Sequence, residues 1–220
     1  MFEYRKSALT AAVSITLLVQ AALAAEEQFF PITSYRVGPY GANGQSFFGG
    51  VFDYLNYVNI KEGGVNGVKL VWEECETEYN NAKGIECYER MKDKAKVSTG
   101  PIHTMSTGVA YALIDKSKED KIPLAMMGYG RTDAVDGSVF PYAFPLVTTY
   151  QMQASAIVKF IKEKEKGSLE GKKIVFLYHD SAYGKEPIVA LQEEAKLNKF
   201  ELTLIPVAHP GNEQGAQWLQ

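Results

Sequence analysis

The stretch IHTMSTGVAYALI (residues 102–114) contains the pattern that decides the fold. A short strand-like segment is followed by a polar Ser-Thr-Gly and then directly by an apolar pattern with helical spacing. This order predicts a strand–loop–helix junction. A hydroxyl in such a loop caps the helix, because it accepts a hydrogen bond from a backbone N–H that lacks a helical partner. Ser106, Thr107 and Gly108 together exceed the needs of one cap, and with the helix dipole they favour an anion such as a carboxylate. On these residues alone, the cap and the anion site both remain open.

Short apolar strands alternate with longer amphipathic segments along the rest of the chain, which is the pattern of repeated strand–helix units. Besides a weak strand that ends before His103, strands are predicted at residues 32–37, 68–72, 122–127, 139–144, 172–178 and 201–207. Helices are predicted at residues 45–59, 80–94, 109–116, 150–166, 183–196 and 213–220. GPYGANG (residues 38–44) is expected to form a glycine-rich turn. The fold class is therefore α/β, with mostly parallel sheets flanked by helices.

The chain is expected to divide into two lobes. Pro141 and Pro145 bracket a predicted strand, and the crossing between lobes is placed at residues 145–149. The predicted domains are a signal peptide at residues 1–25, an N-terminal ligand-binding lobe at 26–148 and a partial C-terminal lobe at 149–220. Two strands are too few for an independent core, so we expect the second lobe to be incomplete and the chain to be C-terminally truncated.

The first 25 residues have the composition of a secretory signal peptide. A basic start at Arg5 and Lys6 precedes an apolar run at residues 8–24, which ends in an A-x-A cleavage pattern at residues 22–24. A membrane anchor is the alternative, but the run is short for a membrane span and contains polar residues. We therefore expect an exported, soluble mature protein.

Charge and cysteine content narrow the function further. The chain has 220 residues and a net charge of -3, and without a basic stripe it gives no reason to expect nucleic acid. In an oxidising compartment, Cys75 and Cys87 are expected to form a disulfide rather than remain free thiols. No cluster of Cys and His residues supplies the ligands of a zinc site, so no metal is expected.

Three other loops lie near the predicted strand ends, where open α/β sheets bind ligands. MMGYGRTD (residues 126–133) is either an ordinary turn or a ligand loop. HDSAYGKEP (residues 179–187) offers Tyr183 as an aromatic wall, whereas its consecutive His-Asp-Ser cannot present a catalytic triad, whose members come from separate loops. GPYGANG lacks the spacing of a dinucleotide fingerprint, and Pro39 removes a backbone N–H there. A nucleotide-dependent enzyme is therefore not expected.

Several segments together resemble the type I periplasmic solute-binding proteins of ABC transporters, in the branched-chain amino acid (leucine/isoleucine/valine) binding group. The resemblance covers nearly all of the mature sequence and is carried by VGPYGANG, GGVNGVKL, ECETEYN, GPIHTMSTG, IPLAMMGYGRTD, FPYAFPLVTTY and HDSAYGKEP, in this order. It implies two α/β lobes that close on a small ligand, without enzymatic activity and without a cofactor. It also implies a monomer in the periplasm that delivers its ligand to permease subunits.

The resemblance also implies a set of ligand contacts. A ligand carboxylate would be held by the Ser/Thr loop and by the next loop of the same lobe, while aromatic side chains cover the ligand. The matching positions are Ser106, Thr107, Gly128, Tyr129, Gly130 and Thr132 for the carboxylate, with Tyr183 and Tyr40 as the aromatic contacts. The MMGYGRTD loop is bulkier than that of typical leucine binders, which leaves amino acids, amides, urea-like molecules and aromatic acids open. The acidic contact for an amino group would follow residue 220.

Two other functions compete with solute transport. The first is an extracellular sensor or regulator on the same fold, because a fold does not determine a function. The second is an exported hydrolase that uses Ser106 and His103, although no acidic residue is placed to orient the histidine.

Overall fold

The structure, a computed structural model, describes residues 27–95, 98–127 and 130–208. The predicted signal peptide, Gly128, Tyr129 and the helix predicted at residues 213–220 lie outside the described residues. In the described part, no helix is both long and apolar enough to cross a membrane.

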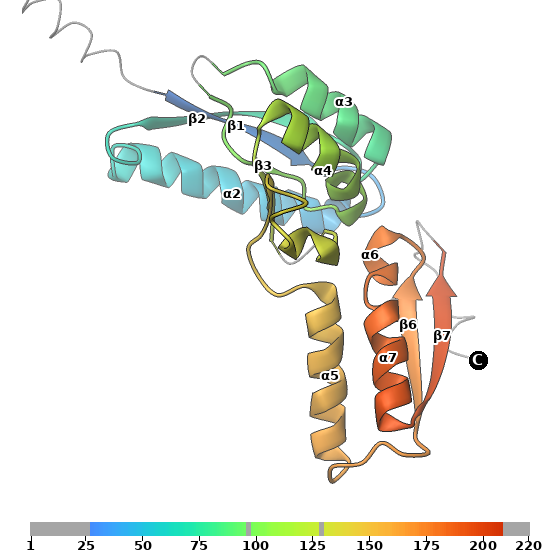
Figure 1. Cartoon of the computed structure of the whole chain (residues 1–220). Helices are drawn as coiled ribbons and strands as arrows, with labels where there is room; N and C mark the ends of the chain where they lie inside the picture. The colour runs from blue at the N-terminus through green and yellow to red at the C-terminus, as the bar shows by residue number, and fades with distance from the viewer. Residues whose placement is uncertain (1–26, 96–97, 128–129, 209–220) are drawn as a thin grey trace, which may run out of the picture.

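Five parallel strands form the first sheet, in the order β2-β1-β3-β4-β5 (Figure 1). Their bounds are β1 Glu27–Ser34, β2 Lys69–Glu76, β3 Ile102–His103, β4 Leu124–Met126 and β5 Ala143–Pro145. Because all the strands run in the same direction, their carboxyl ends meet at one edge of the sheet. Open α/β sheets bind ligands beyond this edge.

The helices α2 (Gly41–Lys61), α3 (Asn81–Met91) and α4 (Thr107–Asp120) cover this sheet (Figure 1). Side chains of β1 alternate between the two faces, as the pleat of a strand requires. Phe30 and Ile32 therefore pack with residues of α2, whereas Phe29 packs with Met91 of α3. The first unit, residues 27–145, is thus a sheet with helices on both faces, as the repeated strand–helix pattern predicts.

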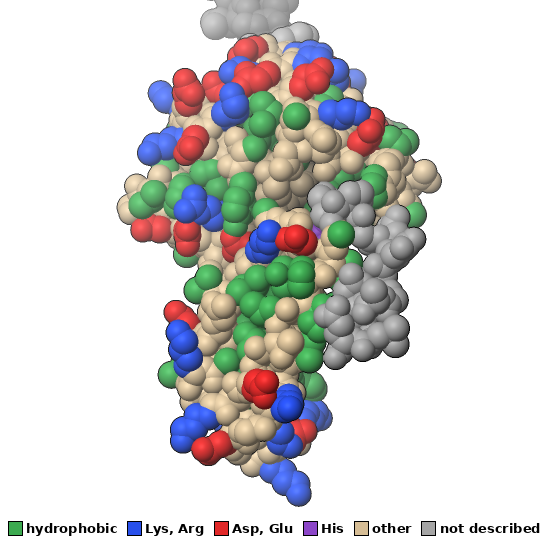
Figure 2. All heavy atoms as spheres, turned by 90° about the vertical axis from the view of Figure 1, so that its right-hand side faces the viewer, with side chains coloured by type: hydrophobic (Ala, Val, Ile, Leu, Met, Phe, Trp, Pro, Cys, Tyr) green, Lys and Arg blue, Asp and Glu red, His purple; other side chains and the backbone are tan. Residues whose placement is uncertain are grey.

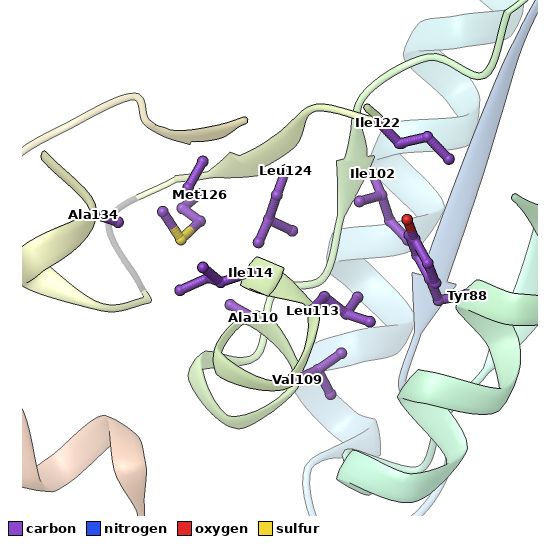
Figure 3. Packing of buried hydrophobic residues seen from close by; sticks show 11 residues of the cluster. Tyr88, Ile102, Val109, Ala110, Leu113, Ile114, Ile122, Leu124, Met126 and Ala134 are labelled. Atoms are coloured by element: carbon purple, nitrogen blue, oxygen red, sulfur yellow. The ribbon is translucent and has the colours of Figure 1, made fainter. Parts of the chain in front are cut away.

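A buried cluster lies between α4 and the strands β3, β4 and β5 (Figure 3). Val109, Ala110 and Leu113 of α4 are almost wholly inaccessible to solvent, and Ile102 and Leu124 of the neighbouring strands are fully buried. Burial of one such side chain stabilises a fold by about 1.5–3 kcal/mol. The apolar residues of IHTMSTGVAYALI therefore form much of this core and fix the position of the loop between them.

The second unit, residues 150–208, contains two parallel strands, β6 (Lys173–His179) and β7 (Glu201–Val207), paired along their whole length. The helices α5 (Tyr150–Lys164), α6 (Ala182–Lys185) and α7 (Ile188–Asn198) complete this unit. Val158 of α5 and Leu191 of α7 pack with Phe176 of β6. On the side that Figure 2 shows, hydrophobic side chains gather on this unit above charged ones at its end.

The prediction of a turn over the whole of GPYGANG is wrong, because α2 already begins at Gly41 within that motif. The close approach of the helix to the end of β1 explains the glycine at position 44. A Cβ on Gly44 would lie 1.9 Å from the carbonyl oxygen of Tyr35, much closer than any real contact. Gly44 therefore serves helix–strand packing rather than a turn.

Two other sequence predictions differ from the structure, and a proline explains each of them. The helix predicted at residues 183–196 is divided into α6 and α7, because Pro187 lacks the N–H that a continuous helix needs. The strand predicted at residues 139–144 begins only at Ala143, two residues after Pro141. The strand predicted at residues 201–207 is confirmed with the same bounds, and the other strands and helices agree within several residues.

The predicted disulfide between Cys75 and Cys87 is present, with 5.7 Å between the two Cα atoms. Cys75 lies near the end of β2 and Cys87 lies in α3. The bond therefore ties the end of β2 to the middle of α3. The loop between these two elements carries Tyr79 into the cleft described next.

Candidate ligand-binding cleft

A cleft of about 470 Å³ opens beyond the carboxyl ends of the strands, between the first and second units. Its walls carry mainly aromatic and hydroxyl side chains. The lining residues are Tyr35, Tyr40, Asn43, Tyr79, Met105, Thr107, Met127, Tyr150, His179 and Tyr183. This volume lies in the range of small-molecule sites, and the location is the one that open α/β sheets use for ligands.

Two of the lining residues have strained backbones. Tyr79 has a φ of 61° and Met105 a φ of 43°, both in the left-handed region that residues with a side chain rarely adopt. Such strain costs about 1–3 kcal/mol per residue and is concentrated at functional sites. The strain therefore supports a functional role for the cleft independently of any sequence motif.

Aromatic rings form a continuous series across the cleft, from the first unit to the second. Tyr79 lies at an edge-to-face angle to Tyr35 and to Tyr40, with ring centroids 5.1 Å and 4.7 Å apart. Tyr40 then contacts His179 of the second unit at 5.8 Å, and its hydroxyl lies 2.6 Å from His179 Nε2. This series places the predicted aromatic contact Tyr40 at the junction between the two units.

Tyr183, the other predicted aromatic contact, also lines the cleft and lies on α6. Its ring packs edge-to-face against Tyr150 of α5, with centroids 5.4 Å apart. The side chain is 48% exposed. Tyr183 therefore offers a ring that a ligand can still cover.

Ser106 and Thr107 differ in position although they are adjacent. The Ser106 side chain is buried and does not line the cleft; its Oγ accepts a hydrogen bond from the Val109 N–H at 3.3 Å, which is the N-cap of α4. Thr107 is equally buried but does line the cleft, and its Oγ1 lies 3.2 Å from the Tyr150 hydroxyl. The Ser106 hydroxyl therefore caps α4, while the Thr107 hydroxyl faces the space where a ligand would lie.

The first backbone N–H groups of α4 are potential hydrogen-bond donors. Within the described residues, the N–H groups of Thr107 and Gly108 have no hydrogen-bond partner. A Cβ on Gly108 would lie 2.5 Å from the Oδ1 atom of Asn81 in α3, which is the end of a side chain that can move aside.

The MMGYGRTD loop has only two of its candidate residues within the described part. The Gly130 N–H donates to Thr107 Oγ1 at 3.4 Å, which ties this loop to the start of α4. Thr132 lies outside the lining of the cleft, and both its N–H and its hydroxyl donate to Glu186 Oε2, at 3.1 Å and 2.6 Å. Thr132 therefore connects the first unit to the second, a contact that the sequence did not predict.

The cleft has few ionisable groups. Apart from the tyrosine phenols, His179 is the only ionisable side chain among its described lining residues. Burial raises the pKa of Tyr79 to about 12, although a hydrogen bond with the Ser106 side chain acts in the opposite direction. Burial also raises the pKa values of Tyr35 and Tyr40. These phenols are therefore neutral hydrogen-bonding groups at physiological pH.

The arrangement around Ser106 and His103 does not resemble a hydrolase site. The Ser106 hydroxyl is buried and caps α4, and His103 Nε2 lies 3.1 Å from the Sδ atom of Met127. Burial lowers the pKa of His103 to about 4. Within the described residues, no group of three or more His, Cys, Asp and Glu side chains could hold a metal ion.

Sequence reasoning missed most of the residues that line the cleft. The missed residues are Tyr35, Asn43, Tyr79, Met105, Met127, Tyr150 and His179. Most of them share one position, since they lie at or just after the end of a strand. Inspection of every strand end, rather than of glycine-rich and hydroxyl-rich loops alone, would therefore have found most of them.

The periplasmic binding protein family matches residues 29–220, which is most of the chain. The chain belongs to the periplasmic binding protein family, whose members are non-enzymatic components of transporters. No curated protein matches the chain.

Solved structures of similar proteins agree with this assignment. A protein from the Pseudomonas fluorescens group, named as an ABC transporter permease, is 51% identical, with a TM-score of 0.77 over 90% of this chain and 48% of that one. A branched-chain amino acid ABC transporter protein from Thermus thermophilus with bound valine is 22% identical, with a TM-score of 0.70 over 83% of this chain and 46% of that one. A solute-binding protein from R. palustris in complex with benzoate is 20% identical, with a TM-score of 0.70 over 89% and 52%. The chain thus spans about half the length of these proteins.

Proposed function

We propose that the protein is the periplasmic substrate-binding component of an ABC importer in the branched-chain amino acid group. It captures a small amino acid or a related carboxylate or amide and delivers the ligand to permease subunits. The observation that carries this proposal is a cleft whose walls come from both units, which meet through Tyr40 and His179. Residues 1–25 act as the export signal in this proposal, and the protein works as a monomer.

The start of α4 is the proposed seat for the ligand's carboxylate. Thr107 Oγ1 and the N–H groups of Thr107 and Gly108 donate hydrogen bonds there, and the helix dipole adds a partial positive charge. Ser106 contributes by capping α4, which holds these donors in position. Gly128, Tyr129 and Gly130 are further proposed contacts of the carboxylate. Gly130 already contacts Thr107.

Closure of the second unit over the ligand is the proposed mechanism of capture. Tyr183 and Tyr40 cover the ligand from the two sides, and the burial of its apolar surface favours the closed form. The contact between Thr132 and Glu186 supports the closed form outside the cleft, which gives Thr132 a role in closure.

A thermal-shift screen of amino acids, amides and aromatic acids on the purified protein tests this proposal. A ligand that binds to the folded protein raises the Tm, because it stabilises the folded state in proportion to the logarithm of its concentration over Kd. We expect a saturable increase with one ligand per chain in calorimetry, and no chemical change of the ligand afterwards. The absence of any shift across the panel, or turnover of the ligand, would contradict the proposal.

A further inference from the structure

We infer that Glu186 is a latch between the two units, a side chain that holds the second unit on the first whichever solute fills the cleft. The inference rests on the proposed function, because closure is the event that the latch controls. It depends on three observations: the two hydrogen bonds that Glu186 accepts from Thr132, the incomplete cap of the helix that Thr132 begins, and the rigid link from Glu186 to the wall of the cleft.

The short 3-10 helix η1 (Thr132–Val135) lacks a side-chain cap from its own unit. Its N-cap residue, Arg131, makes no capping hydrogen bond with its side chain, although the first N–H groups of a helix have no acceptor within the helix. Glu186 supplies an acceptor from the other unit. Its Oε2 accepts from the Thr132 N–H at 3.1 Å and from the Thr132 hydroxyl at 2.6 Å. The second unit therefore completes a turn of the first, which is possible only while the two units are in contact.

The carboxylate of Glu186 depends on this contact in return. Glu186 is half-buried, and in the described part of the chain both donors to its carboxylate belong to Thr132. A partly buried carboxylate is unfavourable unless donors replace the water that it loses. Hydrogen bonds to a charged acceptor are also stronger than those between neutral groups. Because separation of the units would break both bonds at once, the contact favours the joined arrangement.

Glu186 is rigidly linked to the wall of the cleft. It directly follows α6, which carries Tyr183 and lies at the end of the second unit that faces the first (Figure 1). This helix lies tightly against the end of β6, since a Cβ on Gly184 would lie 2.0 Å from the carbonyl oxygen of His179. His179 in turn contacts Tyr40 of the first unit. The second unit is therefore held at two points, at His179 inside the cleft and at Glu186 outside it.

The position outside the cleft gives the latch its own effect on binding. Tyr40 and His179 line the cleft, so a solute can change their contact, whereas Glu186 and Thr132 do not line it. When the arrangement that binds a solute is only partly populated, the apparent affinity falls by that fraction for every solute. Loss of the latch should therefore weaken all solutes by the same factor, while a change in the lining should affect different solutes unequally.

Hydrogen exchange of the Thr132 backbone amide, measured by NMR on the purified protein without added solute, tests the contact. In Glu186→Ala this N–H loses its acceptor and should exchange about tenfold or more faster, the factor that a hydrogen bond to a charged group is worth. Glu186→Gln keeps an acceptor oxygen and should show a smaller increase. The Ile102 N–H, which donates to Pro123 in the first sheet, should not change in either variant. Equal exchange of Thr132 in the unaltered protein and in Glu186→Ala would overturn the inference.

The distance between spin labels on the two units tests the latch itself. Lys61→Cys on α2 and Lys159→Cys on α5 place the labels at exposed positions, while the native cysteines are bonded to each other. Glu186→Ala should raise the ratio of separated to joined molecules about tenfold and so shift the distance distribution to longer values. Glu193→Ala, an exposed change on α7, is the matched control and should leave the distribution unchanged. The same distribution in Glu186→Ala as in the control would overturn the latch.

These outcomes separate the inference from the proposed function. If solutes of the thermal-shift screen bind but neither measurement responds to Glu186→Ala, the latch is wrong while the proposed function stands. If both measurements respond and no solute binds, the proposed function is wrong while the latch stands. Calorimetry of the solutes that bind should show one common factor of loss in Glu186→Ala. Unequal losses would overturn the latch in favour of a direct contact between Glu186 and the solute.

Discussion

At the residue scale, adjacent hydroxyls in one loop perform different tasks. Ser106 is buried and completes the first turn of α4, while Thr107 faces the cleft. A serine and a threonine side by side do not reveal this division, because either hydroxyl can cap a helix. The backbone decides it, since Ser106 has the extended φ and ψ of an N-cap residue.

Replacement of Ser106 tests the cap. Ser106→Ala should lower the free energy of unfolding by about 1–2 kcal/mol, because the Val109 N–H and the buried Tyr79 phenol both lose a partner. Denaturant unfolding measures the change. Ser106→Thr keeps a hydroxyl at the cap and should lose less stability. Equal losses in the two variants would show that the hydroxyl does not act as a cap.

His103 should make stability depend on pH. Burial lowers its pKa to about 4 from 6.5, so between these values the unfolded chain binds the proton more readily than the folded one. Stability should therefore fall as the pH decreases from 6.5 towards 4, by a contribution on the order of 2–3 kcal/mol. Denaturant unfolding across this range measures the slope. In His103→Gln the slope should be smaller, and an unchanged slope would exclude His103 as its source.

At the element scale, α2 and the loop after β2 owe their form to contacts that lie outside them. The start of α2 lies against the end of β1, and the disulfide ties the end of β2 to the middle of α3, across the loop between them. The close approach of α2 to β1 cannot be recognised from the local sequence pattern, which explains why a turn was predicted at the start of α2.

Glycines in α2 should respond in opposite ways to replacement by alanine. Gly44→Ala should destabilise the protein by at least about 2 kcal/mol, because the new Cβ would collide with the Tyr35 backbone, which cannot rotate away. Gly49→Ala should stabilise it by about 0.5–1 kcal/mol, since nothing lies within 4 Å of that Cβ and alanine favours a helix. Thermal unfolding measures both, and a neutral Gly44→Ala would contradict the close approach.

The disulfide should support both stability and the cleft. The double variant Cys75→Ala with Cys87→Ala should lose about 2–3 kcal/mol of stability, because the unfolded chain is no longer constrained. The strained loop that carries Tyr79 would also be released, so the affinity for the ligand should fall. Unfolding and calorimetry of this variant measure the two effects. Unchanged affinity would show that the loop keeps its form without the bond.

At the scale of the whole molecule, the fold was predictable and the cleft was only partly so. Hydrophobic periodicity depends on neighbours within one element, and it therefore indicated β1, α4 and β7. The cleft forms where several loops converge, and its strained residues Tyr79 and Met105 have no local signature. The contact between Thr132 and Glu186 joins residues 54 positions apart, which no spacing rule anticipates.

The central claim is that the ligand's negative group lies at the start of α4, and calorimetry of Thr107→Val tests it most directly. The valine keeps the volume but removes the hydroxyl, so the affinity for the ligand should fall by about 1.5–3 kcal/mol, the value of a hydrogen bond to a charged group. Thr203→Val, an exposed change on β7, is the matched control and should bind as the unaltered protein does. We expect this loss for Thr107→Val alone, and unchanged affinity in a folded Thr107→Val protein would show that the negative group does not lie at the start of α4.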